Sequence, residues 1–457
     1  MKALGLIIAL FCLSSVFTQS PDMVVEIFRH GIRSPEAHEF DPSWEKIGYG
    51  ELTNAGIRQQ YVLGAALKEL YPNLLLPYSP AKIFVQSTQE NRTIMSALSQ
   101  LYGVYYQEGP NLGDGYPAEV AVPPYNSDEV KKILNDLTGV DAAIPDHYFP
   151  LPVHSILKKG DNLLQSYLNC PNADKFYFSQ KNDTKVQQTY AKLAETIKNL
   201  EKLGLNIHNV DDLDDLGDTI IADSANHVPL PGGLDPTTQD YKDVVFWALW
   251  YEIYPTLNMP LQRQLFSGPL MNNVLNLFQQ KRNGTTDLSF SFYAAKESLL
   301  ASLLSAFGIM TPECLLENWE AQKAQKPIPH PQCNYPMYAS NLIFEYFNTA
   351  APYVVFKYNG NVMKICDGKD SCTLDEFTAK IQQITGGYDL AKFQQWCGTA
   401  PQVTKESGAP EKGSSDVILI VIAVALAVVL VGLHIRNKKA KEAVYTSPAL
   451  YRDLEVV

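Results

Sequence analysis

A run of seven residues near the start of the chain, Arg29–Pro35 (RHGIRSP), places one histidine between two arginines. Two guanidiniums can each hold a phosphoryl oxygen in forked geometry, and an imidazole held between them can attack phosphorus. Gly31 lets the backbone turn sharply and come close to a ligand. The alternative is that the run has no chemical role and is an exposed basic strand end, but the full pattern directly after a strand favours a phosphoryl-transfer site.

Strands of an open α/β sheet must position these side chains. The apolar stretch 23–28 predicts a buried strand directly before the run. The same design recurs twice, as strand 83–85 before helix 91–102 and as strand 288–293 before a helix that ends at Phe307. Parallel strands place their carboxyl ends together, so residues about 270 positions apart can meet at one ligand site. We expect an α/β fold with a central, mostly parallel sheet flanked by helices.

Several segments together resemble the histidine acid phosphatase family, in the acid phosphatase and phytase branch of the histidine phosphatase superfamily. The likeness runs from about residue 22 to about residue 398. The segments that carry it are Arg29–Pro35, Leu52–Gly56 with Gln60, Ser87–Thr93, Phe292–Ser298 and Cys366–Gly368 with Cys372.

The resemblance implies hydrolysis of phosphomonoesters in two steps. His30 is then the nucleophile that forms a phosphohistidine, and water later releases the phosphate. Arg29, Arg33 and Arg92 are the implied phosphate-binding arginines. No metal or cofactor is expected, because the guanidiniums supply the electrostatic stabilisation of the transition state.

One departure from the family pattern concerns the last catalytic segment. The family's His-Asp pair is Lys296-Glu297 in this chain. Glu297 keeps a carboxyl group for the catalytic acid, and Lys296 keeps a positive charge for phosphate on a longer, more flexible side chain. Since a displacement of about 1 Å can cost about 100-fold in rate, the alternative is a catalytically impaired ectodomain that binds phosphorylated ligands or acts as a receptor module.

Both ends of the chain carry targeting signals. Residues 1–19 read as a secretory signal peptide with a short apolar run. Residues 416–435 read as a single transmembrane helix, and basic residues follow it, which predicts a type I membrane protein. A GPI signal is disfavoured by those basic residues and by the polar tail, residues 436–457.

The remaining residues, 20–398, form the predicted ectodomain, and 399–415, rich in Pro, Gly, Ser and charged residues, form a stalk. Within the ectodomain, about 160–255 lacks strand–helix alternation and reads as a helical cap insertion. Its clearest helix is predicted over 185–203, with Gly204 at the C-cap. The acidic run 211–215 lacks the ligand spacing of a calcium loop, so we expect a solvated helix or turn there.

Composition limits the partners. The 457 residues are 46% hydrophobic and carry a net charge of −12, so nucleic acid is an unexpected partner. A phosphomonoester substrate must then be held by a local cluster of arginines against an acidic background. No pattern in the sequence specifies an oligomeric state or the alcohol of the substrate.

Cysteines agree with a secreted ectodomain. Cys12 lies in the signal peptide, and the other six imply three disulfides with fifteen possible pairings. The sequence contains no Cys-x-x-Cys pair, so a zinc site is not expected. The resemblance implies the pairs Cys170–Cys397, Cys366–Cys372 and Cys314–Cys333.

Short surface signals complete the expectations. Asn182 and Asn283 are predicted glycosylation sites, whereas Asn91 adjoins Arg92 and is expected to stay unmodified. In the tail, Tyr451 and Leu454 form a Tyr-x-x-Leu sequence of the type read in endocytic and lysosomal sorting. We therefore expect a lysosomal or endosomal membrane, or the cell surface, with the ectodomain lumenal or extracellular.

Overall fold

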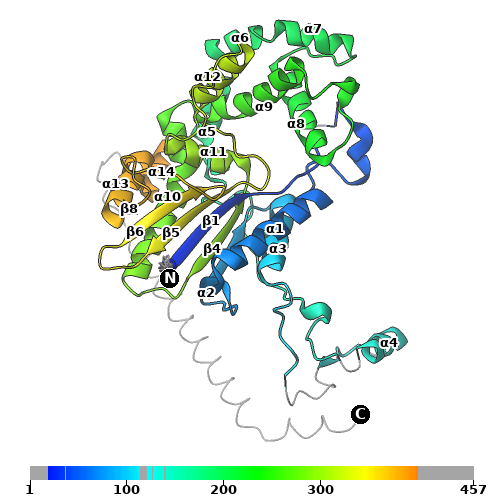
Figure 1. Cartoon of the computed structure of the whole chain (residues 1–457), viewed down its shortest axis with the longest axis vertical. Helices are drawn as coiled ribbons and strands as arrows, with labels where there is room; N and C mark the ends of the chain where they lie inside the picture. The colour runs from blue at the N-terminus through cyan, green and yellow to red at the C-terminus, as the bar shows by residue number, and fades with distance from the viewer. Residues whose placement is uncertain (1–18, 37, 114–120, 126, 138–139, 400–457) are drawn as a thin grey trace, which may run out of the picture. The chain divides into compact units, whose positions relative to one another are not determined.

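One sheet organises the described part of the chain. A computed structural model describes residues 19–36, 38–113, 121–125, 127–137 and 140–399. The strands run in the order β3-β2-β4-β1-β5-β6-β7, and β8 pairs with β6 (Figure 1). Their bounds are β1 Met23–Arg29, β2 Ile83–Ser87, β3 His154–Ser155, β4 Phe290–Ala295, β5 Asn341–Phe347, β6 Tyr353–Tyr358, β7 Asn361–Val362 and β8 Cys372–Thr373.

The sheet has a parallel half and an antiparallel half. Strands β3, β2, β4 and β1 are parallel neighbours, whereas β1–β5, β5–β6, β6–β7 and β6–β8 pair antiparallel. The predicted mostly parallel sheet is therefore wrong for the second half, and the sheet is mixed. A short connection joins β5 to β6, and only antiparallel strands can be joined that way.

Helices cover both faces of the sheet, and β1 shows how the sequence directs this. Val24 and Phe28 face a core shared with α1, α2 and α3, while Val25 and Ile27 face a core shared with α10, α11 and α13. This alternation is the two-residue period of a strand buried on both faces. The bounds are α1 Asn54–Leu70, α2 Pro72–Leu75, α3 Asn91–Val104, α10 Pro260–Arg282, α11 Glu297–Ala306 and α13 Leu374–Thr385.

A second group of helices gathers beyond the carboxyl end of β1, at the top of Figure 1. It has its own apolar core, in which Trp247 and Trp250 are fully buried. These helices carry side chains toward the ends of the parallel strands. The bounds of the helices of this group are α6 Thr184–Ala191, α7 Ala194–Lys202, α8 Val210–Asn226, α9 Gln239–Leu257 and α12 Pro312–Lys323.

The predicted helix 185–203 is wrong as a single element. It is divided into α6 and α7, because the amide N–H groups of Lys192 and Leu193 bond three residues back, to Thr189 and Tyr190. Such 3₁₀-type bonds tighten and interrupt an α-helix. Leu193 and Leu200 remain fully buried, so the apolar face predicted from the sequence still packs inward.

Three disulfides hold the described chain, and their pairing agrees with the one that the resemblance implies. Cys170–Cys397 joins the start of α5 to the end of α14 across 227 positions. The other pairs, Cys314–Cys333 and Cys366–Cys372, close shorter loops. The two helices run over α5 Pro171–Lys181 and α14 Leu390–Cys397, and α4, Asp128–Asp136, lies in the segment after α3.

The predicted targeting segments lie outside the described residues. These are the predicted signal peptide (1–19) apart from Gln19, the predicted stalk (399–415) apart from Thr399, the predicted transmembrane helix (416–435) and the predicted tail (436–457) with Tyr451 and Leu454. Among the helices that are described, none combines the length and apolarity needed to cross a bilayer.

Candidate active site

The carboxyl ends of parallel strands bring the predicted residues together. Arg29, the last residue of β1, is in register with Ala295, the last residue of β4, and β2 ends beside β4 with Ser87 opposite Ala294. The chain continues from β4 into α11 through Lys296, so Glu297 begins a helix at the sheet edge. The expectation that residues far apart in sequence meet here is confirmed.

Close packing on α1 holds the loop after β1. A side chain on Gly31 would come within 2.4 Å of the Gly56 carbonyl oxygen, so this position requires glycine. The backbone N–H of Gly31 donates to Ser96, and that of Ile32 donates to Gln59. Gly31 is absent from the positive-φ residues. Its glycine therefore serves contact with α1, which differs from the sharp turn toward a ligand that the sequence suggested.

His30 is completely buried, and its imidazole is oriented by the backbone. Its Nδ1 lies 2.8 Å from the Gly31 carbonyl oxygen. A carbonyl can only accept, so Nδ1 carries the proton and Nε2 keeps its lone pair. Burial lowers the pKa of His30 to about 4, with Glu297 opposing and Arg29 reinforcing that shift. The ring is therefore neutral above that pH, in the form that can act as a nucleophile.

Glu297 lies close to both His30 and Arg29. Its Oε2 lies 3.0 Å from Nε of Arg29 and 3.4 Å from Nε2 of His30. Burial by itself raises the pKa of Glu297, but Arg29, followed by His30 and Arg33, outweighs burial and holds the pKa well below its usual range. Because the carboxyl group reaches both the predicted nucleophile, His30, and Arg29, a predicted phosphate ligand, it lies where the predicted mechanism needs a general acid.

Arg33 is held by a carboxylate from α8. Its Nη2 and Nη1 donate to the two carboxylate oxygens of Asp218, at 2.6 and 3.2 Å, and Nη1 also donates to the Ser34 carbonyl. Its buried Nε has no hydrogen-bond partner among the described residues. Asp218 therefore fixes the plane of the guanidinium while one N–H remains available for an anion.

Arg92 and Lys296 each contact residues outside the cluster of Arg29, His30 and Glu297. Arg92 donates to Glu36 at 2.7 Å and to the Gly50 carbonyl oxygen at 3.2 Å. The Lys296 ammonium lies 5.9 Å from the centre of the Tyr167 ring. Neither side chain lines the cavity described below, although both act electrostatically near it. The predicted phosphate contacts of Arg92 and Lys296 stay predictions.

A cavity of about 220 Å³ lies between the carboxyl ends of the strands and the helices α8 and α9. Arg29, Arg33 and Glu297 contribute to its lining. The guanidinium carbon of Arg29 lies 4.4 Å from the centre of the Tyr338 ring, close enough for cation–π attraction. The cavity therefore joins two cations and the candidate acid in one enclosed space.

The residues that α8 contributes to this cavity were not predicted from the sequence. The run 211–215 does form a helix, as one of its two expected forms, but Asp214, Asp215 and Asp218 line the cavity instead of facing only solvent. Asp214 and Asp218 are four positions apart, which places them on one face of a helix. That spacing was the signal available in the sequence.

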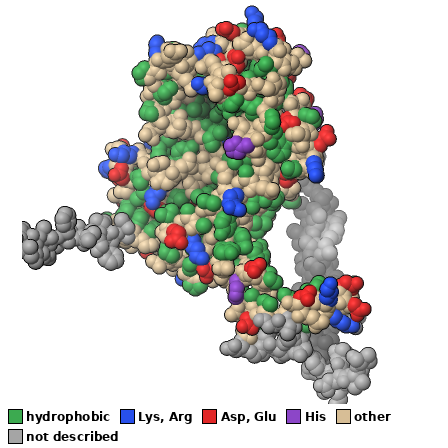
Figure 2. Space-filling view, turned by 45° about the vertical axis from the view of Figure 1, so that its right-hand side comes forward, with side chains coloured by type: hydrophobic (Ala, Val, Ile, Leu, Met, Phe, Trp, Pro, Cys, Tyr) green, Lys and Arg blue, Asp and Glu red, His purple; other side chains and the backbone are tan. Residues whose placement is uncertain are grey.

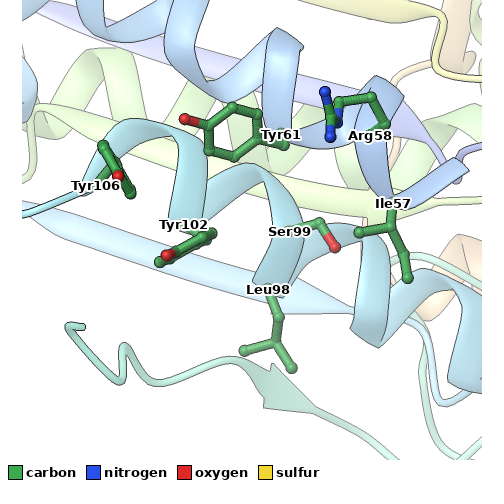
Figure 3. A pocket seen from close by; sticks show the side chains of 7 residues that line it. All are labelled: Ile57, Arg58, Tyr61, Leu98, Ser99, Tyr102 and Tyr106. Atoms are coloured by element: carbon green, nitrogen blue, oxygen red, sulfur yellow. The ribbon is translucent and has the colours of Figure 1, made fainter. Parts of the chain in front are cut away.

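A larger hollow of about 540 Å³ lies on the outer surface of α1 and α3. Figure 3 shows Arg58 and Tyr61 on one side of it and Tyr102 and Tyr106 on the other. None of the predicted site residues lines it, so size alone does not identify the chemical site. In the described ranges, no three His, Cys, Asp or Glu side chains are grouped so as to hold a metal ion.

Comparison with known proteins gives one family. The sequence model described as "Histidine phosphatase superfamily (branch 2)" matches residues 22–359. Bovine prostatic acid phosphatase is 24% identical over 63% of this chain and 70% of its own length. Lysosomal acid phosphatase of Xenopus laevis is 25% identical over 67% and 66%, and the bovine lysosomal enzyme 27% identical over 64% and 63%. The chain thus spans about two thirds of the length of these relatives.

Solved structures share the fold. The phytase from D. castellii matches with a TM-score of 0.55 and 16% identity, over 86% of this chain and 87% of its own. The Hafnia alvei phytase in complex with tartrate matches with a TM-score of 0.54 and 14% identity, over 83% and 98%. These matches support the architecture of a mixed sheet between helices.

Proposed function

The chain belongs to branch 2 of the histidine phosphatase superfamily, and from that premise we propose that it is an acid phosphatase that hydrolyses phosphomonoesters through a phosphohistidine. The meeting of Glu297 with both Arg29 and the buried His30 carries this proposal. The named relatives, which are acid phosphatases, support the class of reaction.

In the first step, Nε2 of His30 attacks phosphorus. The N–P bond forms as the bond from phosphorus to the alcohol oxygen breaks, and Glu297 gives its proton to that oxygen. Arg29 and Arg33 stabilise the charge on the phosphoryl oxygens. The Nδ1–H of His30 stays on the Gly31 carbonyl, so the ring remains aligned as it becomes positively charged.

Glu297 must be protonated before this step, although it is ionised in the empty cavity. An incoming phosphoryl group brings negative charge beside the carboxylate and takes up the attraction of Arg29. Both effects raise the pKa of a carboxyl group. Substrate binding at acid pH therefore supplies the acid in its protonated form.

In the second step, water breaks the N–P bond. The Glu297 carboxylate takes a proton from the water, the water oxygen attacks phosphorus, and inorganic phosphate leaves. His30 returns to its neutral form. We place Arg92 and Lys296 around this centre as further positive charges that hold the substrate anion.

We also propose that this ectodomain is held at a membrane. The apolar segment 416–435 with its following basic residues supports a type I anchor. Lysosomal relatives and the Tyr451–Leu454 sequence support a lysosomal or endosomal membrane. Asn182 and Asn283 are both exposed, as glycan carriers must be, and Asn91 is exposed as well.

The test is release of phosphate from p-nitrophenyl phosphate at acid pH by the purified ectodomain. The wild type should be active, and His30→Ala should lose at least about 1000-fold, because the nucleophile is removed. His38→Ala, an exposed histidine, is the matched control and should keep full activity. An inactive wild type whose melting temperature still rises with phosphate or vanadate would overturn the enzyme in favour of a phospho-ligand binding module.

A further inference from the structure

The charge inside the cavity is unusual for a site that receives phosphate. Its lining contains two guanidiniums, from Arg29 and Arg33, and six carboxyl groups. A phosphoryl group alone would meet more negative than positive charge there. The carboxyl groups belong to Glu36, Asp214, Asp215, Asp218, Glu252 and Glu297.

Three of these carboxyl groups form no ion pair with any described residue. Glu297 contacts Arg29, and Asp218 contacts Arg33. Among the ion pairs of the described residues, none involves the other three groups on α8 and α9. The nearby Lys181 ammonium is already 2.7 Å from Asp211. We call the three groups the acidic wall, and they are Asp214, Asp215 and Glu252.

The cavity that the acidic wall lines is also lined by Arg33, which has a hydrogen-bond donor that could bind an anion. Nε of Arg33 is buried without a hydrogen-bond partner among the described residues, and Oε1 of Glu36 lies 3.8 Å away. The Arg33 side chain is only 6% exposed, so solvent does not readily satisfy it. Buried donors in native proteins almost always have a partner. The cavity therefore offers one end to an anion and a wall to a cation.

Resting on the proposed function, we propose that the preferred substrates are phosphomonoesters of positively charged alcohols, with the phosphoryl group at Arg29 and Arg33 and an ammonium group at the acidic wall. A zwitterion of this kind would balance the charge on both sides of the cavity. Glu252 is oriented for the contact by the Tyr335 hydroxyl, which donates to its Oε2 at 2.6 Å.

The acidic wall also disfavours polyanionic substrates. A second phosphate placed beyond the first would face Asp214 and Glu252, which offer no positive charge when protonated and repel the phosphate once they ionise. On the face shown in Figure 2, Lys and Arg side chains are scattered among apolar and uncharged ones and form no continuous basic surface. We therefore expect inositol polyphosphates to be poor substrates.

Protonation of the wall adds a pH signature. Burial and then the neighbouring carboxylates raise the pKa of Asp214 well above its usual range, and burial followed by Glu297 raises that of Glu252 to about 8. Both groups gain charge as pH rises, so preference for a cationic alcohol should grow with pH. The charged and titratable groups around them are Asp211, Asp215, Asp218, Tyr177, Lys181, Glu36, Arg29, Glu297 and Tyr335.

The experiment compares kcat/KM for phosphoethanolamine, glycerol 2-phosphate and inositol hexakisphosphate, with p-nitrophenyl phosphate as the reference. We expect phosphoethanolamine to exceed glycerol 2-phosphate by about tenfold, an ordinary value for one charge-assisted contact, and by more at pH 7.5 than at pH 4.5. Hydrolysis of the reference without this preference would overturn the inference alone. Absence of hydrolysis of the reference would overturn the proposed function itself.

Two isosteric variants assign the preference to the wall. At pH 7.5, where an ammonium beside these groups favours their ionised form, the ratio of phosphoethanolamine to glycerol 2-phosphate should fall at least about fivefold in Asp214→Asn and in Glu252→Gln, because neither replacement can ionise. Glu195→Gln, an exposed position on α7, should leave activity and ratio unchanged. Unchanged ratios in both wall variants, with unchanged melting temperatures, would show that the cation is bound elsewhere or not at all.

Discussion

The contact between His30 and Glu297 places a neutral imidazole beside an ionised carboxylate in a buried site. Arg29 makes this arrangement stable, since its Nε lies 3.0 Å from the same carboxylate oxygen. In the proposed reaction, a phosphoryl group that binds Arg29 weakens the ion pair between Arg29 and the Glu297 carboxylate. In the proposed mechanism, the glutamate therefore changes from a partner of arginine to a proton donor as substrate binds.

Replacement of Glu297 by glutamine should separate leaving groups. An alkyl alkoxide needs a proton as it leaves, whereas p-nitrophenolate leaves readily without one. General acid catalysis supplies about 10²–10⁴-fold, so Glu297→Gln should lower kcat for glycerol 2-phosphate about 100-fold more than for p-nitrophenyl phosphate. Equal losses on the two substrates, measured side by side, would remove Glu297 from the role of acid.

At this scale the sequence predicted the cluster of Arg29, His30 and Glu297, because strand ends and a dense motif surround each residue. It did not predict Asp218, whose role depends on the folding of a distant helix over Arg33. No local pattern around residue 218 specifies that partner. The predicted phosphate contact of Lys296 stays a prediction, and the ammonium lies 5.9 Å from the centre of the Tyr167 ring.

Among the elements, α8 has the most direct effect on the site, because it supplies the carboxylate that orients Arg33. The bidentate contact of Asp218 fixes a guanidinium that would otherwise rotate freely. It occupies donors on both Nη atoms and leaves Nε free. The helix therefore acts as a positioning element for a group that begins 185 positions earlier in the chain.

Asp218→Ala should lower kcat/KM for p-nitrophenyl phosphate by about 10- to 100-fold, because a loosened guanidinium loses alignment with the phosphoryl group. Asp218→Asn should lose less, since an amide oxygen can still accept from Arg33. Asp174→Ala on α5, which is exposed, is the control. Tighter inhibition by inorganic phosphate together with raised kcat/KM in Asp218→Ala would show that Asp218 competes with phosphate instead of positioning Arg33.

Strand β1 carries a buried acid unrelated to catalysis. Glu26 is fully buried and accepts from Gln100 at 2.7 Å and from Asn341 at 2.8 Å. Burial raises its pKa from an ordinary 4.5 to about 7, despite the opposing bonds from Asn341 and Gln100. The folded state thus keeps its proton in a range where the unfolded state loses it. The stability that Glu26 contributes is full below pH 4.5 and is lost as pH rises toward 7.

Glu26→Gln should remove this dependence. Between pH 4.5 and 7 the unfolding free energy of the variant should fall by roughly 3 kcal/mol less than that of the wild type, as measured by urea unfolding at several pH values. The side-chain Oε1 of Gln100 is buried without a hydrogen-bond partner among the described residues, so it can accept from the new amide. Glu69→Gln, an exposed position on α1, is the control, and parallel profiles for wild type and Glu26→Gln would contradict the assignment.

The elements themselves were predicted where a periodic pattern is long or a strand is flanked by chemistry. β1, β2 and α3 lie where the sequence placed them. The antiparallel half of the sheet was missed, because pairing direction depends on connections that periodicity does not report. The break between α6 and α7 was missed for a related reason, since apolar spacing continues through it.

For the whole molecule, the disulfides indicate an oxidising compartment, and the proposed reaction together with the buried Glu26 favours an acidic one. Three disulfides in the described chain are typical of secreted or lumenal proteins. The stability contributed by Glu26 and the need for a protonated Glu297 both favour acid conditions. An acidic lumenal compartment would therefore suit both the fold and the proposed reaction.

Tyr451→Ala should move the full-length protein from internal membranes to the cell surface, because the change removes the aromatic residue of the Tyr-x-x-Leu sequence. Surface biotinylation of the protein expressed in animal cells measures the shift, which we expect to be severalfold. Tyr445→Ala, another tyrosine of the same tail, is the matched control. An unchanged surface fraction for Tyr451→Ala would count against sorting by this sequence.

The most direct test of the central claim is to trap the phosphorylated enzyme. Brief incubation with a ³²P-labelled phosphomonoester at acid pH, followed by quenching in alkali, preserves a phosphohistidine, and peptide mapping locates the label. We expect acid-labile label on His30, present in wild type and His38→Ala and absent from His30→Ala. A wild-type enzyme that turns over substrate with no label, or with label on another residue, would contradict it.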